Sequence, residues 1–158
     1  MSVASVKAQF EALNLDLPIL ETAENTATVA LAAAAHGVEP GRIAKTLAFE
    51  LHDRRVVLLV ARGDARIDNA KFKTALGKGK MLNPDVVADI TGHPVGGVCP
   101  FGLAQAMPIY LDESLQAFEE VLPAAGSVNS AVRMSVSLLA RITQGQWVDV
   151  CRPPAGPG

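Results

Sequence analysis

Two adjacent segments near the centre of the chain carry the patterns of two different kinds of β-strand. The first, RIAKTLAFEL at residues 42–51, alternates between two faces, and the more apolar face carries Ile43, Lys45, Leu47, Phe49 and Leu51. The second, VVLLVA at residues 56–61, is apolar throughout, as in a strand that is covered on both sides. The polar letters HDRR between them favour a turn. We therefore expect a β-hairpin whose second strand is buried.

Helix and strand patterns surround this hairpin without regular βαβ spacing. Apolar residues at helical spacing, capping residues and terminal glycines predict helices over 2–13, 26–38, 68–77, 83–92, 112–118 and 134–142. Further strands are predicted at 18–20, 108–112, 121–126 and 146–150, and a loop rich in glycine and proline at 93–108. The sequence thus predicts an α+β fold, with a mixed, mostly antiparallel sheet that curls around a pocket between flanking helices.

The length and composition favour a single domain. With 158 residues, 49% of them hydrophobic, the chain can bury one substantial core. We assign residues 1–151 to this domain and the letters RPPAGPG, residues 152–158, to a disordered tail. The first residues lack the pattern of a secretion signal, and no apolar run approaches the roughly 18 residues of a membrane-spanning helix. We therefore expect a soluble, cytoplasmic protein.

Cysteine and histidine usage argues against a disulfide framework and against a metal centre. Cys99 and Cys151 are too few for a set of disulfides and form no paired metal motif. His36, His52 and His93 are scattered without metal-ligand spacing. We expect no metal and no cofactor.

Positive charge is concentrated in residues 54–80, although the whole chain has a net charge of −2. The segment holds two aspartates and eight basic residues: Arg54, Arg55, Arg62, Arg66, Lys71, Lys73, Lys78 and Lys80. A local basic field suits a partner that carries phosphates, because the attraction does not depend on nucleotide sequence. An ordinary solvated surface has the same charge pattern, so both interpretations stay open.

Lys45 is the first candidate for a functional side chain. Lysine is rarely buried without a partner, yet the strand register places Lys45 on the more apolar face. In a cleft, its ammonium could hold a phosphate or a carbonyl oxygen, or stabilise a developing negative charge. Alternatively, its stem packs against apolar neighbours while its head reaches water.

The segment GGVCPFG, residues 96–102, is the second candidate. Its three glycines let the backbone approach a ligand closely and leave amide groups free to donate hydrogen bonds. It is not a phosphate-binding P-loop, because the lysine and the hydroxyl residue of that motif are absent. An ordinary turn has the same composition.

A cysteine nucleophile is a third candidate. Cys99 follows His93 closely, and a thiolate activated by an imidazole needs the two groups in contact. Free cysteines are more often small, buried hydrophobic residues. The sequence alone leaves the contact between the two side chains open.

Three segments in this order, IAKTLAFE, GHPVGGVCPFGL and AAGSVNS, resemble the YbaK and prolyl-tRNA-synthetase-associated editing domain family. The likeness spans nearly the whole chain, and the strand lysine and the GGxxPFG loop are its strongest elements. The resemblance implies the fold of that family and a stand-alone aminoacyl-tRNA deacylase that acts in trans on mischarged tRNA. It also implies hydrolysis by a positioned water, without a metal and without a covalent intermediate.

The resemblance also assigns roles to individual residues. Lys45 matches the family's essential lysine, near the aminoacyl ester and the terminal adenosine, and is the expected catalytic side chain. The expected substrate-binding residues are Thr46, Gly96, Gly97, Val98, Cys99, Phe101, Gly126 and Ser127. Cys99 then lines the pocket without a chemical role, and the basic residues of 54–80 form a track for the acceptor stem of tRNA.

The implied substrate is a mischarged tRNA, with tRNA-Pro first, that carries a small amino acid such as alanine, serine or threonine. AAGSVNS lacks the arrangement of the cysteine-specific branch, which argues against Cys-tRNA. Prolyl-tRNA synthetase is the implied protein partner. Two alternatives stay open: a non-catalytic module that binds tRNA or a synthetase, and a cysteine-dependent hydrolase that uses Cys99.

Overall fold

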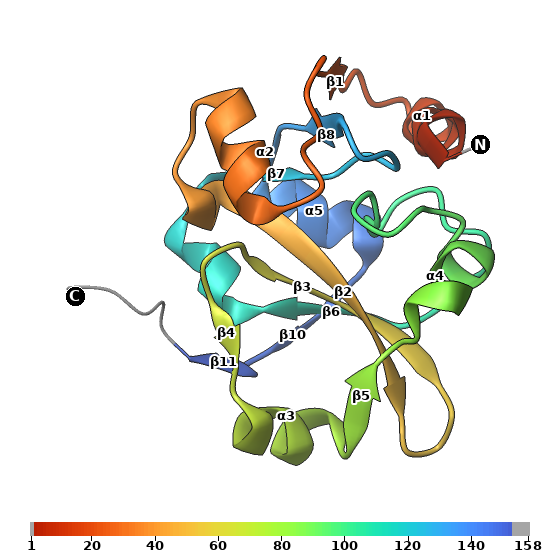
Figure 1. Cartoon of the computed structure of the whole chain (residues 1–158), viewed down its shortest axis with the longest axis vertical. Helices are drawn as coiled ribbons and strands as arrows, with labels where there is room; N and C mark the ends of the chain where they lie inside the picture. The colour runs from red at the N-terminus through yellow and green to blue at the C-terminus, as the bar shows by residue number, and fades with distance from the viewer. Residues whose placement is uncertain (1, 153–158) are drawn as a thin grey trace.

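β2 (Ile43–Leu51) and β3 (Val56–Arg62) form the predicted hairpin in the computed structural model, which describes residues 2–152. The two strands are antiparallel and lie in the middle of the sheet (Figure 1). Residues 57–61 are completely buried. The prediction that the second strand is covered on both faces is therefore confirmed.

The hairpin belongs to a mixed sheet of seven strands. The other strands of the described chain are β1 (Ile19–Glu21), β4 (Arg66–Ile67), β5 (Gly79–Met81), β6 (Ile109–Asp112), β7 (Glu120–Pro123), β8 (Ser130–Val132), β9 (Met134–Ser135), β10 (Gln146–Val148) and β11 (Cys151–Arg152). The order in the sheet is β10-β6-β3-β2-β7-β9, and β5 pairs with β2 beside this path. β2–β7, β3–β6 and β6–β10 are parallel pairs, and the remaining pairs are antiparallel.

Capping residues define the ends of the helices much as the sequence predicts. The helices are α1 (Ser2–Ala12), α2 (Val29–His36), α3 (Asn69–Leu76), α4 (Pro84–Thr91), α5 (Val136–Thr143) and the 3-10 helices η1 (Pro40–Arg42) and η2 (Glu113–Ala117). The Thr28 side chain caps α2, and Gly37 ends it in the left-handed conformation. Asn83 caps α4, and Gly92 ends it in the same way. The short helix predicted at 112–118 is the 3-10 helix η2.

Several short strands are not predicted from the sequence. β4, β5, β8, β9 and β11 have two or three residues each, which is too short to show a periodicity. Met134 and Ser135, predicted to begin a helix, pair with β7 instead, and Ser135 caps α5. Arg152, assigned to the tail, lies in β11. The rest of the expected tail, residues 153–158, lies outside the described residues.

Helices cover both faces of the hairpin, so the core is divided by the sheet. Figure 1 shows α1 and α2 at the top of the molecule, α3 at the bottom and α4 at one side. On one face of the hairpin, Ala44 belongs to a core cluster that includes side chains of α1 and α5, and Ala48 belongs to a cluster that includes Val87 of α4. On the other face, Phe49 packs with Phe72 of α3 and with β11. Within residues 2–152, no helix is long and apolar enough to cross a membrane.

The edge of β2 that faces away from β3 is paired only at its two ends. β7 pairs with residues 43–44, and β5 pairs with residues 49–51. Between them, no described strand pairs with this edge of β2 at residues 45–48. The Leu82 N–H donates to the Ala48 carbonyl at 2.9 Å. The sheet is therefore split at this edge, and the split is where the candidate site lies.

Candidate functional site

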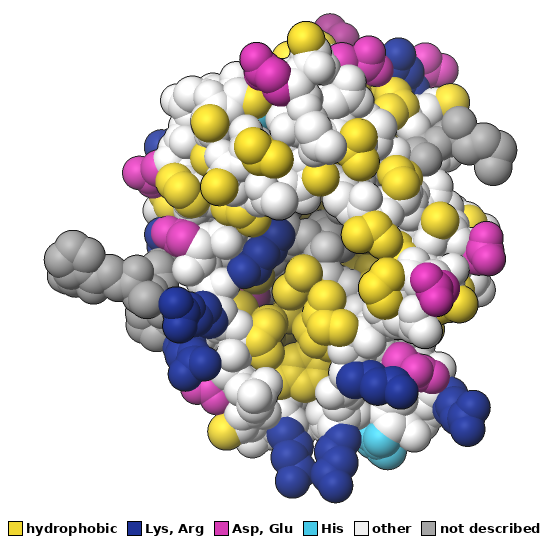
Figure 2. Space-filling model, viewed as in Figure 1, with side chains coloured by type: hydrophobic (Ala, Val, Ile, Leu, Met, Phe, Trp, Pro, Cys, Tyr) yellow, Lys and Arg dark blue, Asp and Glu magenta, His cyan; other side chains and the backbone are white. Residues whose placement is uncertain are grey.

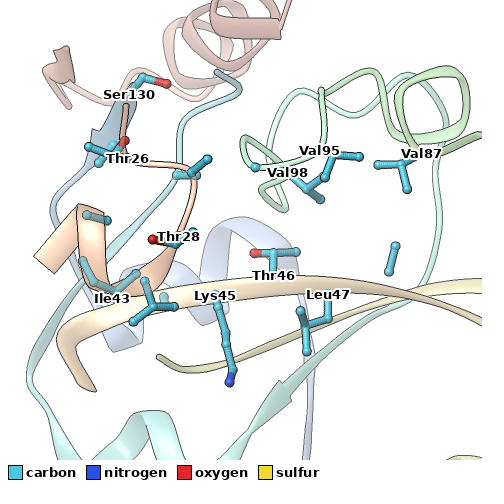
Figure 3. A pocket seen from close by; sticks show the side chains of 18 of the residues that line it. Thr26, Thr28, Ile43, Lys45, Thr46, Leu47, Val87, Val95, Val98 and Ser130 are labelled. Atoms are coloured by element: carbon cyan, nitrogen blue, oxygen red, sulfur yellow. The ribbon is translucent and has the colours of Figure 1, made fainter. Parts of the chain in front are cut away.

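A pocket of about 310 Å³ lies at the split between β5 and β7. β2 runs along its base, the start of α2 forms one wall, and the loop after α4 forms the opposite wall (Figure 3). Most of its lining is apolar or small: Thr26, Ala27, Thr28, Val29, Ala32, Ile43, Ala44, Lys45, Thr46, Leu47, Ala48, Met81, Leu82, Pro84, Val87, Val95, Gly96, Val98, Leu122, Ala124, Ser130 and Ala131. The pocket therefore suits a small ligand group held by a few polar contacts.

Thr46 points from β2 into the pocket, toward Val98 (Figure 3). Its hydroxyl oxygen is buried and has no hydrogen-bond partner among the described residues. Leaving such a group unpaired costs about 1–3 kcal/mol, so a ligand that supplies a partner gains from it. The Ala48 carbonyl faces the β5 edge, and strand residues alternate, so the backbone N–H and C=O of Thr46 face the open edge.

Lys45 leaves β2 on the side opposite to Thr46 (Figure 3). Its Nζ donates a hydrogen bond to the carbonyl oxygen of Ala65, in the turn after β3. Burial lowers the pKa of Lys45, while the acidic groups of Cys151 and Asp64 act in the opposite direction. An ammonium has three donors, so Lys45 has further donors for a substrate oxygen.

The glycine loop and the loop at Gly126 and Ser127 pack directly against each other. A Cβ atom on Gly97 would lie 2.7 Å from the backbone of Ser127, and one on Gly96 would lie 2.7 Å from the Cβ of Ala27. Gly96 also has a φ of +89°, which a side chain disfavours. Gly97 therefore lets the loop approach the backbone of Ser127, and Gly96 lets it approach Ala27.

The sequence-predicted residues of these loops divide into two groups. Gly96 and Val98 border the pocket. Gly97 and Ser127 lie behind the wall, where the Ser127 hydroxyl donates to the hydroxyl of Ser130 at 2.7 Å. Ser130 borders the pocket, so Ser127 contacts a residue of the pocket lining without bordering the pocket itself. Gly126, with a φ of +100° in the same turn, likewise does not border the pocket, contrary to the expectation from the sequence.

Cys99 and Phe101 do not line the pocket, which corrects the expectation from the sequence. Both side chains are fully buried in the core that also contains Val6 and Phe10 of α1. The Phe101 ring packs edge-on against the Phe10 ring, with 5.2 Å between the ring centres. Alternate residues of the loop thus face the core, because burying their apolar side chains is favourable.

Cys99 does lie beside His93, but not in a reactive setting. The Sγ of Cys99 is 3.5 Å from the Nε2 of His93, which also contacts the carbonyl oxygen of Phe101. Burial raises the pKa of Cys99 to about 12 and lowers the pKa of His93. A fully buried thiol of this kind stays protonated at neutral pH. Within residues 2–152, no group of three or more His, Cys, Asp and Glu side chains could hold a metal ion.

The basic residues of 54–80 differ in how exposed their side chains are and in whether they form ion pairs. Six of its side chains belong to exposed residues: Arg54, Arg55, Arg66, Lys73, Lys78 and Lys80. Arg54, Lys78 and Lys80 border a shallow polar cleft beside the β2–β3 turn. Figure 2 shows Lys and Arg side chains gathered over the lower half of one face, around an apolar patch. Lys71 is bonded to Asp149 at 3.1 Å.

Arg62 departs from the expectation that it belongs to an open basic track. Its Nε and Nη2 donate to the two carboxylate oxygens of Asp64, at 2.6 and 2.9 Å. Its guanidinium also lies 4.8 Å from the centre of the Phe118 ring. A phosphate would have to displace these partners of Arg62 before it could bind the guanidinium. The sequence alone does not reveal this pairing.

Sequence reasoning missed one wall of the pocket. Thr28, Val29 and Ala32 come from the start of α2, and Thr26 precedes them. The threonines are visible in the sequence only as helix-capping candidates, and the alanines only as helix formers. Nothing in that pattern points to a site.

The decisive comparison with known proteins concerns residues 23–142, which match the model of the family described as "Aminoacyl-tRNA editing domain". This span contains Lys45, the glycine loop and the whole pocket lining. The chain belongs to the aminoacyl-tRNA editing domain family. The resemblance noted in the sequence is thereby confirmed.

Curated relatives of this editing domain are found over most of its length. YwhH of Bacillus subtilis (strain 168) is 44% identical over 154 residues, covering 96% of this chain and 98% of that protein. EbsC of Enterococcus faecalis, named as a proposed Cys-tRNA(Pro)/Cys-tRNA(Cys) deacylase, is 29% identical over 116 residues, covering 72% and 71%. The proline–tRNA ligase of Citrifermentans bemidjiense is 31% identical over 116 residues, but these cover only 20% of that enzyme.

A solved structure shares the fold of this editing domain. It is described as a proposed trans-editing enzyme for prolyl-tRNA synthetase, with a TM-score of 0.88 and 30% sequence identity. The match covers 96% of this chain and 98% of that chain. The predicted fold class, a mixed sheet curled around a pocket and flanked by helices, is confirmed.

Proposed function

We propose that this editing domain is an aminoacyl-tRNA deacylase. It acts in trans on tRNA-Pro that carries a small amino acid such as alanine, serine or threonine. The observation that carries the proposal is the split in the sheet, where a small pocket meets the Thr46 hydroxyl and the Lys45 stem. An ester at the mouth of this pocket can reach polar groups from both faces of β2.

The reaction is hydrolysis of the ester between the amino acid and the terminal ribose. Water adds to the ester carbonyl carbon, the bond to the ribose oxygen breaks, and the proton from water passes to that oxygen. Negative charge develops on the carbonyl oxygen during this step, and an ammonium within reach stabilises it. Lys45 supplies this ammonium. Its stem is flexible, and its ammonium has N–H donors beyond the one that the Ala65 carbonyl accepts.

The amino-acid side chain enters the pocket above β2. The base of the pocket consists of small residues, including Ala44 and Ala48, and its walls are aliphatic. The buried Thr46 hydroxyl has no partner among the described residues, so it can bond a small polar side chain or the amino group of the substrate. A difference of one methylene changes affinity by only about 1–3 kcal/mol, so the ranking of small amino acids rests on fine geometry.

tRNA binding is assigned to the exposed basic residues near the β2–β3 turn and β5. Among the described residues, Arg54 and Lys78 form no ion pair, and the ammonium of Lys80 lies 4.0 Å from the Glu50 carboxylate. The similarity to a fifth of a proline–tRNA ligase supports tRNA-Pro as the nucleic acid and the synthetase as a partner.

The test is deacylation by the wild-type chain of a panel of tRNA-Pro charged with alanine, serine, threonine, cysteine or proline. Release of one or more small amino acids with Pro-tRNA-Pro spared is the expected result. Preferential hydrolysis of Cys-tRNA-Pro, in line with the name of EbsC, would overturn the choice of amino acid. Binding of tRNA without release of any amino acid would overturn the assignment as an enzyme.

A further inference from the structure

The turn between β3 and β4, residues 62–66, holds the acceptor of the Lys45 ammonium. Ala65 supplies the carbonyl oxygen, and its own N–H donates to the carbonyl of Arg62 at 3.2 Å. Across the same turn, the Arg62 guanidinium holds both oxygens of Asp64. A carboxylate thus lies next in sequence to the carbonyl that holds Lys45.

Arg62 is fixed by neighbours outside the turn. Its guanidinium lies over the Phe118 ring, and its backbone N–H donates to the Ser114 hydroxyl at 3.4 Å. A Cβ atom on Gly41 would lie 2.8 Å from both the Arg62 Nη2 and the Phe118 ring, so this space is full. Only 20% of the Arg62 side chain is exposed. A bidentate pair held this way has defined geometry, unlike most surface ion pairs.

Asp64 is the carboxylate that competes for Lys45. Its charge raises the pKa of Lys45 against the effect of burial, and the charge of Lys45 lowers the pKa of Asp64. Within residues 2–152, however, the two side chains form no direct ion pair. The other acidic group that faces the ammonium is the Cys151 thiol of β11, with the Asp112 carboxylate beside that thiol.

We propose that Arg62 is a positioning residue for Lys45: by holding both oxygens of Asp64, it keeps this carboxylate off the ammonium. This inference rests on the proposed function. The ammonium then rests on a neutral carbonyl oxygen, which competes weakly with the developing charge of a substrate. An ammonium paired with Asp64 would be neutralised before the substrate arrived.

Two variants of the full chain separate this role from simple support of the turn. Arg62→Ala leaves Asp64 without its partner, so the freed carboxylate can capture Lys45. The double variant Arg62→Ala/Asp64→Asn removes the freed charge as well. Thermal melts and amide NMR spectra verify that each variant is folded, and Arg62→Gln replaces Arg62→Ala if the smaller side chain prevents folding.

The first measurement needs no substrate, so it stands even if the proposed function fails. The pKa of Lys45 is followed by NMR through its Cε resonance, assigned by its loss in Lys45→Ala. We expect the pKa to rise in Arg62→Ala, because a nearby carboxylate favours the charged ammonium, and to fall back in the double variant. An unchanged Lys45 pKa in Arg62→Ala would overturn the proposal.

The second measurement is single-turnover deacylation of the mischarged tRNA that the wild type hydrolyses best. Arg62→Ala should lose roughly 10- to 100-fold in rate, as expected for a displaced reacting group, and the double variant should recover most of this loss. The alkaline limb of the pH–rate profile should also move to higher pH in Arg62→Ala. A double variant as slow as the single one would identify a merely structural ion pair and overturn the proposal.

Discussion

At the scale of single residues, Thr46 carries an unusual cost. Its hydroxyl oxygen is buried without a partner among the described residues, in a strand, where β-branched valine is also a favoured residue. We expect Thr46→Val to raise the free energy of unfolding by about 1 kcal/mol, because it removes an unsatisfied polar group. Urea unfolding measures this change, and the deacylation panel should show altered discrimination between serine and alanine.

A matched control for Thr46 lies in the same protein. The Thr91 hydroxyl is also buried, but it donates to the Val87 carbonyl at 2.7 Å and accepts from the His93 N–H at 3.1 Å. Thr91→Val should therefore lower the free energy of unfolding by about 1–3 kcal/mol. Equal losses of stability in both variants would contradict the assignment of the Thr46 hydroxyl to a ligand.

Cys99 gives a second prediction at the residue scale. Because burial raises its pKa to about 12 and closes it off from solvent, the thiol should react slowly with iodoacetamide at pH 7.5 in the folded protein. Mass spectrometry should show rapid modification only after denaturation. Cys99→Ala should retain deacylation. Fast alkylation of the native protein that also stops deacylation would restore the cysteine-hydrolase alternative.

At the scale of elements, the wall of the pocket depends on the contact between two loops. A Cβ atom on Gly97 would lie 2.7 to 2.8 Å from the Ser127 backbone, which cannot rotate away as a side chain does. We expect Gly97→Ala to cost about 1–3 kcal/mol of stability, as overpacking does. The displaced wall should also raise the KM for the mischarged tRNA.

Gly37 is the control for this substitution. It ends α2 with a φ of +66°, and an added Cβ would meet nothing within 4 Å. Gly37→Ala should therefore cost about 1 kcal/mol from backbone strain alone, and the KM should not change. If both variants changed the KM alike, the contact between the loops would not shape the pocket.

Patterns among neighbouring residues predicted the main helices and strands, but not how these elements pack together. The hairpin at 42–61 and the caps of α2 and α4 were predictable, because alternation and capping residues act over a few positions. The split in the sheet was not, since β5 has only three residues. The pairing of Arg62 with Asp64 was also hidden, because paired and solvated charges look identical in a sequence. Tertiary packing decided that Cys99 belongs to the core.

At the scale of the whole molecule, exposed positive charge lies on one side of the pocket, where we propose that tRNA binds. Lys78 and Lys80 are exposed beside the pocket's base strand, and the nearest carboxylate to Lys80 is Glu50 at 4.0 Å. Replacing both lysines by alanine should weaken tRNA binding and reduce the slope of log K against log salt by about one unit per lost phosphate contact. Filter binding over a range of salt concentrations measures the slope. A slope unchanged from that of the wild type would place the tRNA elsewhere.

The most direct test of the whole account is the single-turnover rate of deacylation of the preferred mischarged tRNA by Lys45→Ala. Its control is Lys7→Ala, which removes an exposed lysine of α1, far along the sequence from the site and outside the basic segment. We expect Lys45→Ala to lose at least about 10²-fold in rate, a typical loss for one group that stabilises developing charge, while Lys7→Ala keeps the wild-type rate. Equal rates in Lys45→Ala and the wild type would contradict the account.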